Sequence, residues 1–203
     1  MRKIITMIVF GTILISYTAA QGIEITAFTG YSFNSQVNTY YGKYKVDDSQ
    51  NYGGILGYEL QPDMFVEFLY NRSDTRIDYY YQNSYNPVDM STEYFQLGAL
   101  KQMGAANLKP FGAASLGLAR FNLKRATGDF AQEDYFFMAA NLGGGVKILL
   151  GDRLGIRLQA RLSMPMVFSG FFLTAGTGGA GASAGFRIPL VQFDLSAGLT
   201  LRL

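Results

Sequence analysis

The chain has 203 residues, a formal net charge of +2, no cysteine and no histidine. A disulfide scaffold is therefore excluded, and so is any catalytic arrangement that depends on histidine or cysteine. Charged residues make up 16% of the sequence, which is below the roughly 25% of soluble globular domains.

Residues 1–20 have the form of a secretory signal peptide. A basic start precedes an apolar run that is shorter than a membrane-spanning helix, and small residues precede a cleavage point after Ala20. We expect this segment to be removed on export, leaving residues 21–203 as one domain. Loss of Arg2 and Lys3 leaves basic and acidic residues equal in number, so nucleic acid is not expected as a partner.

Beyond the signal segment, apolar and polar residues alternate in eight stretches of the chain. This period of two is typical of strands with one apolar and one polar face. Each stretch reaches the roughly 9–11 residues that a tilted strand needs to cross a bilayer. In chain order they are 23–33, 51–61, 64–74, 92–103, 108–121, 135–150, 154–164 and 191–203.

The last stretch raises the question of which face points outward. If its apolar face points into a core, the protein is a secreted barrel of lipocalin type. The polar faces, however, carry few charges and many small polar residues, which suits a crowded interior better than a solvated surface. We therefore expect lipid to contact the odd-numbered residues Val191, Phe193, Leu195, Ala197, Leu199, Leu201 and Leu203.

Short and long connections alternate between these stretches. Short links rich in turn residues join the second to the third, the fourth to the fifth and the sixth to the seventh. An up-and-down barrel places all such turns at one end and all long loops at the other. The sequence thus predicts an all-β, eight-stranded antiparallel transmembrane barrel. Aromatic residues near the long connections suggest a membrane-interface girdle: Tyr31, Phe33, Tyr52, Tyr70, Phe95, Phe121, Tyr135 and Phe136.

These features resemble the small eight-stranded outer-membrane barrels of Gram-negative bacteria, of the OmpA-transmembrane-domain and OmpX type. Ser196, Gly198, Leu201 and Leu203 match the family's C-terminal assembly signal, although the family usually ends in an aromatic residue. The resemblance implies a location in the outer membrane among lipid and lipopolysaccharide. It also implies the barrel-assembly machinery and periplasmic chaperones as partners during biogenesis.

Charges on the polar faces define the candidate site inside the barrel. Two carboxylates flank the first short turn and two cations flank the third, and these hairpins lie opposite each other in an eight-stranded ring. We expect the opposite charges to meet across the lumen, and a further pair to form on neighbouring strands. The network, either a structural plug or part of an ion pathway, comprises Glu59, Glu67, Lys147, Arg157, Arg161 and Asp194.

No catalytic, cofactor or metal site is predicted. The GTGGAG segment, residues 176–181, matches a nucleotide-binding pattern but has no βαβ context. Acidic pairs at 47–48 and 133–134 lack the spacing of metal ligands. We expect an outer-membrane protein that supports membrane integrity and whose tyrosine-rich loops bind an extracellular ligand or mediate adhesion. The alternative is a narrow channel or a transporter of small hydrophobic solutes, with the apolar stretch 166–172 at its entrance.

Overall fold

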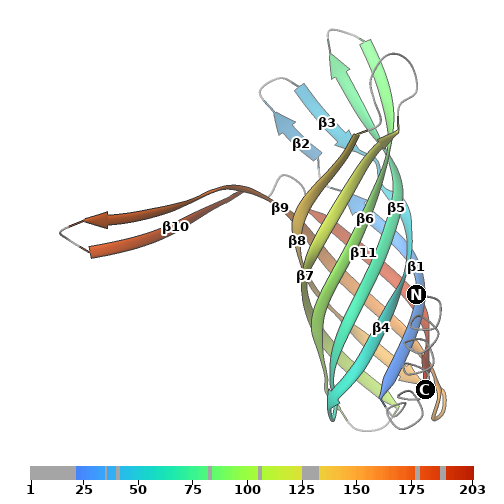
Figure 1. Ribbon diagram of the computed structural model, residues 1–203. Coiled ribbons are helices and arrows are strands. Elements are labelled where there is room, and N and C mark those ends of the chain that lie inside the picture. The colour runs from blue at the N-terminus through green and yellow to red at the C-terminus, as the bar shows by residue number, and fades with distance from the viewer. Residues whose placement is uncertain are drawn as a thin grey trace, which may run out of the picture.

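The computed structural model describes residues 22–34, 36–39, 42–81, 84–104, 107–124, 133–176, 179–187 and 191–203. The expected signal peptide lies outside this part of the chain. Within it, no helix is both long and apolar enough to cross a membrane. Eight long strands form the body of the molecule (Figure 1): β1 (Ile23–Asn34), β4 (Ser49–Gln61), β5 (Met64–Tyr81), β6 (Ser84–Gln102), β7 (Leu108–Lys124), β8 (Glu133–Leu149), β9 (Leu154–Gly176) and β11 (Gln192–Arg202).

These strands close into a ring in which every neighbouring pair is antiparallel. Each strand pairs with the next of the eight along the chain, and β1 pairs with β11 to complete the circle. A closed barrel leaves no unpaired strand edge along its wall. The predicted all-β, eight-stranded antiparallel barrel is confirmed, and each predicted stretch overlaps one of these strands.

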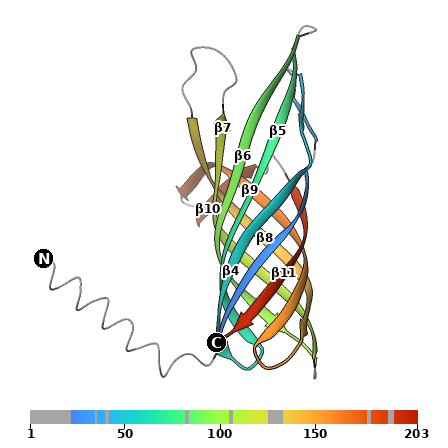
Figure 2. The ribbon, with the colours of Figure 1, turned by 90° about the vertical axis from the view of Figure 1, so that its right-hand side faces the viewer.

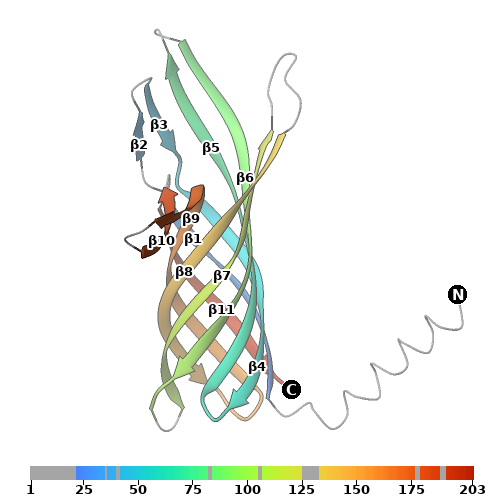
Figure 3. The same cartoon turned by 60° about the vertical axis from the view of Figure 1, so that its left-hand side comes forward.

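The two ends of the barrel differ in the length of their connections. The short turns after β4, β6 and β8 lie at the same end as the C-terminus (Figures 2 and 3). In the first of these turns, Asp63 adopts a left-handed backbone conformation with φ of 63°, which aspartate tolerates better than most residues. The alternation of short and long connections is therefore present in the structure.

The long connections contain strands where the sequence predicts loops. β5 and β6 remain paired as far as Tyr81 and Ser84, well beyond the predicted stretches. β2 (Gln36–Thr39) and β3 (Gly42–Val46) form a hairpin that pairs with β5. β10 (Gly179–Arg187) pairs with the outer part of β9 and extends sideways from the barrel (Figure 1).

The apolar faces point outward and the polar faces point into the lumen. On β11, Leu199 is 68% exposed whereas Asp194 is 1% exposed. A barrel with this arrangement has an apolar outer wall, as lipid contact requires, and the lipocalin-type alternative is wrong. Most of the predicted aromatic girdle lies on the outside. The exceptions are Phe121 and its register partner Tyr135: Phe121 packs inward against Tyr94 and Ala119, and Tyr135 lies on the inward-facing side of β8, although it is 42% exposed.

Candidate functional site

The layer of the lumen nearest the short turns contains an ion pair between β1 and β8. Lys147 Nζ lies 2.5 Å from a carboxylate oxygen of Glu24, and both side chains are buried. The ammonium group also lies 4.5 Å from the centre of the Phe65 ring, where a cation is attracted to the π-face. Glu24 was not among the predicted lumen charges, although it stands at one of the alternate positions of β1 whose side chains point into the lumen.

A second ion pair spans the lumen between β5 and β9. Arg157 donates two hydrogen bonds to the Glu67 carboxylate, of 2.6 and 2.9 Å, and its Nε donates to Gln159 at 2.9 Å. Its guanidinium lies 4.6 Å from the centre of the Phe111 ring. This fork geometry is the strongest arrangement of an arginine and a carboxylate. It joins one predicted carboxylate to one predicted cation across the barrel.

Glu59, expected to face the same cations, pairs instead with Arg202 near the short turns. The physical reason is its position in β4, close to the turn and beside the end of the C-terminal strand. Nearby, Lys109 Nζ contacts an Asp63 carboxylate oxygen at 2.6 Å. The hydrogen bond from Lys109 holds the pKa of Asp63 below its usual range. Both pairs lie at the rim rather than in the lumen centre.

Arg161 and Asp194 are register neighbours on β9 and β11 but form no ion pair within the described part of the chain. Asp194 accepts hydrogen bonds from Ser32 Oγ at 2.6 Å and from Gln192 Nε2 at 2.7 Å. The Arg161 guanidinium instead lies 5.2 Å from the centre of the Phe28 ring. The expected pairing therefore needs correction: neutral donors surround the carboxylate, and a ring covers the cation.

These contacts give the lumen a repeated construction. Lys147, Arg157 and Arg161 each lie over an aromatic ring, and all three are buried. An eight-stranded barrel has an interior just wide enough for side chains. The arrangement can seal the interior and brace opposite walls against each other.

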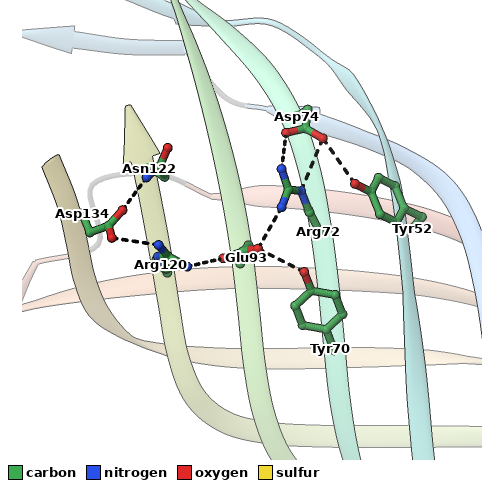
Figure 4. A network of polar contacts seen from close by, with 8 residues as sticks. All are labelled: Tyr52, Tyr70, Arg72, Asp74, Glu93, Arg120, Asn122 and Asp134. Carbon is green, nitrogen blue, oxygen red and sulfur yellow. Dashed lines mark hydrogen bonds and ion pairs between the residues drawn. The ribbon is translucent and has the colours of Figure 1, made fainter. Parts of the chain in front are cut away.

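A second charged group, absent from the sequence analysis, lies on the outside of the barrel (Figure 4). This outer charge cluster joins four strands through Asp74, Arg72, Glu93, Arg120 and Asp134. Glu93 lies at its centre, 3.1 Å from Arg72 and 3.2 Å from Arg120. Arg72 contacts Asp74 at 3.0 Å, and Arg120 contacts Asp134 at 2.8 Å. Negative and positive charges therefore alternate along the outer surface of four neighbouring strands, β5 to β8.

Aromatic residues border the outer charge cluster. Tyr70 donates a hydrogen bond of 3.1 Å to Glu93, and its ring packs against that of Phe95 at a tilt of 45°, with ring centres 5.1 Å apart. The centre of the Phe136 ring lies 6.0 Å from the Arg120 guanidinium carbon. Aromatic rings beside charged groups are typical of the interface between lipid tails and headgroups. Glu93 and Phe95 are two residues apart and therefore lie on the same, outward face of β6. This spacing was the sequence signal that could have revealed the cluster.

The described residues include no group of three or more acidic, histidine or cysteine side chains placed to hold a metal ion. Of the GTGGAG segment, Gly176 and residues 179–181 belong to the antiparallel strands β9 and β10, where Gly176 pairs with Gly179, and residues 177–178 lie outside the described part of the chain. In the C-terminal strand, Leu201 and Leu203 point outward and are 41% and 52% exposed. Ser196 and Gly198 have inward parity on the same strand.

Comparison with known proteins supports the architecture. No family model and no curated protein matches the sequence. Among solved structures, Neisserial surface protein A aligns with a TM-score of 0.61 at 14% identity, covering 90% of this chain and 98% of that chain. The fold is that of the small outer-membrane barrels. The outer membrane protein OprG of Pseudomonas aeruginosa aligns with a TM-score of 0.59 at 12% identity, covering 90% of this chain and 97% of that one.

Proposed function

We propose that the protein is an integral outer-membrane protein that displays a binding surface outside the cell and contributes to membrane integrity. The filled lumen carries this proposal, because it leaves the extended outer strands as the part available for recognition. β5 and β6 have 18 and 19 residues, whereas about 9–11 residues cross a bilayer. The excess length projects the β5–β6 hairpin beyond the apolar wall.

The outer charge cluster supports contact with the polar headgroups of the outer leaflet, including lipopolysaccharide. Its two arginines lie between three carboxylates, next to aromatic side chains. Headgroups that carry both phosphates and divalent cations offer partners for both signs of charge. The proposal includes cleavage of residues 1–20 as a signal peptide and recognition of the last strand by the barrel-assembly machinery, with periplasmic chaperones as further partners during biogenesis. It includes no enzymatic activity.

A labelling experiment tests the orientation on which this proposal depends. The chain has no cysteine, so single cysteines report without background. We expect Asp89→Cys, on the outer part of β6, to react with a membrane-impermeant maleimide on intact cells. Pro62→Cys, in a short turn, should react only after the outer membrane is permeabilised. The opposite pattern, or equal labelling of both, would contradict the proposed orientation.

The binding role is tested by shortening the β5–β6 hairpin. Replacement of residues 80–85 by a two-residue turn shortens the projecting hairpin and keeps residues 77–79, which pair with β3, in place. We expect cells that produce this variant to show reduced retention on glycan- or protein-coated surfaces compared with cells that produce equal amounts of the unaltered protein. Equal retention on every surface that the unaltered protein binds would contradict a binding role for this hairpin.

A further inference from the structure

The β9–β10 hairpin leaves the barrel wall near the outer charge cluster. Pairing between β8 and β9 stops at Met138 and Met166. Two residues from Met138 on β8, the Phe136 ring lies beside Arg120 of the outer charge cluster. From there β9 continues with β10 as its partner and runs sideways, across the barrel axis (Figure 1). Because the axis of a spanning barrel crosses the membrane, a ribbon in this direction runs parallel to the membrane plane.

The register of the hairpin gives it one wholly apolar face. Paired residues of antiparallel strands share a face, and so do alternate residues along each strand. The pairs on this face are Phe168 with Phe186, Phe171 with Ala184, Leu173 with Ala182, and Ala175 with Ala180. The opposite face contains five glycines, Thr174, Ser183 and Arg187, together with Val167 and Phe172. The hairpin is therefore an amphipathic ribbon.

A β-bulge lies where the hairpin leaves the wall. Gly185 pairs with Gly170 but Phe186 pairs with Phe168, so Ser169 is an extra residue on β9. An extra residue reverses which alternate positions of a strand belong to a given face. The faces of β9 are therefore numbered differently on the two sides of the bulge.

This bulge makes the apolar face of the hairpin continuous with the outer wall of the barrel. On the wall, the outward residues of β9 have even numbers, as in Leu158, which is 42% exposed. Beyond the bulge the same face passes to the odd-numbered residues Phe171, Leu173 and Ala175. Without the bulge, Thr174 and glycines would continue the outward face. Since lipid contacts this face on the wall, its continuation indicates lipid as the partner of the hairpin.

Charge distinguishes this hairpin from the β5–β6 hairpin. Residues 166–187 contain one charged residue, whereas residues 74–89 contain four. An uncharged strand with an unpaired edge promotes aggregation in water. Within the described part of the chain, β10 has no partner other than β9, and its free edge cannot lie in hydrocarbon either, because its backbone groups need polar partners. The membrane interface meets both conditions, with lipid chains below and headgroups and water around the edge.

We propose that the β9–β10 hairpin lies on the outer leaflet as an interfacial anchor, with its apolar face against the lipid chains. Where the outer wall bends away from the barrel axis, its lipid-facing side turns toward the membrane, which gives the apolar face this direction. Amphipathic segments bind membrane surfaces through burial of one apolar face. The inference rests on the proposed placement of the long connections at the outer leaflet, but not on the binding role of the β5–β6 hairpin.

Fluorescence quenching by labelled lipid tests the proposal. Leu173→Cys and Thr174→Cys place a fluorescent label on one face or the other, in a chain without other cysteines. The variants are refolded into phosphatidylcholine vesicles whose lipids have a nitroxide near the top of the acyl chain. We expect quenching at position 173 to be about twofold stronger than at position 174. Leu158→Cys and Asp89→Cys supply the quenched and unquenched references.

Two adjacent phenylalanines provide a matched pair of variants. Phe171→Ser removes an aromatic ring from the apolar face, and Phe172→Ser removes the same ring from the opposite face. We expect Phe171→Ser to weaken the quenching of a label at position 173, whereas Phe172→Ser should leave it near its original value. Variants are compared as folded barrels, which migrate faster in unboiled than in boiled detergent gels.

Equal quenching at positions 173 and 174, or equal effects of the two serine variants, would overturn the proposal. Disulfide cross-links between copies through Ala182→Cys on β10, without lipid quenching at position 173, would overturn it in favour of pairing between two copies of the chain. These vesicle measurements do not depend on orientation in the cell, which Asp89→Cys and Pro62→Cys report on intact cells. Failure of the anchor and failure of the proposed function are therefore distinguishable.

Discussion

At the scale of single residues, the buried Arg157–Glu67 ion pair is expected to contribute strongly to the free energy of unfolding. Arg157→Ala leaves the Glu67 carboxylate buried without its partner, and we expect a loss of about 3–5 kcal/mol in the free energy of unfolding. The double change Arg157→Ala with Glu67→Ala should cost less, because it removes both charges together. Urea unfolding of the refolded variants measures both values.

The matched control for this pair lies at the rim. Arg202 and Glu59 also form an ion pair, but their side chains are 41% and 21% exposed. Solvent weakens such a pair, and we expect Arg202→Ala to cost only about 0–1 kcal/mol. A coupling energy near zero between Arg157 and Glu67 would show that their fork does not stabilise the barrel.

The residue scale also shows where prediction from sequence ends. The inward parity of Glu67 and Arg157, together with their opposite positions in the ring, was sufficient to predict their meeting. The alternation of side chains shows which residues face the lumen but not which of them form ion pairs. For this reason Glu59 was assigned to the wrong cation and Glu24 was missed. Asp194 faces the lumen, as predicted from its strand. Its carboxylate, however, accepts hydrogen bonds from the neutral side chains of Ser32 and Gln192 and forms no ion pair with Arg161.

At the scale of strands, alternation predicted the wall of the barrel but not its outer extensions. Inside the membrane each strand must have one apolar face, and the resulting pattern is visible in sequence. Beyond the apolar wall both faces of a hairpin meet a polar environment, so the pattern disappears even though pairing continues. This explains why the outer parts of β5 and β6 and the strands β2, β3 and β10 were assigned to loops.

The strand β9 allows a test of membrane depth on one apolar face. Leu158 and Leu154 both point outward, with exposures of 42% and 56%, but Leu154 is the first residue after a short turn. Arginine at Leu158, near the expected midplane, should cost about 2–4 kcal/mol, and arginine at Leu154, near the interface, only about 0–1 kcal/mol. Unfolding in lipid vesicles measures the difference.

Equal costs for the two arginine variants would contradict the assigned depth. Leu158→Ala and Leu154→Ala serve as controls for lost apolar contact alone. The depth assignment requires that the excess cost of arginine over alanine be larger at Leu158 than at Leu154, because only the charge is sensitive to distance from the interface.

At the scale of the whole molecule, the central question is whether the barrel conducts ions. Three buried cations, each over an aromatic ring, occupy the interior, and two of them are tied to carboxylates. Permeation would require these side chains to move aside together and expose their charges. Such a rearrangement is unfavourable because each buried pair would lose its partner.

We therefore expect the unaltered protein in planar bilayers to show no steady conductance. The double change Arg157→Ala with Glu67→Ala shortens two side chains that fill the lumen, so it should produce a measurable leak. The rim pair supplies the control, since Arg202→Ala with Glu59→Ala leaves the lumen filled and should stay closed. Sustained currents through the unaltered barrel, abolished by a blocker of the lumen, would favour the channel function over the surface-binding function, because the interior would then be a pathway and not a brace.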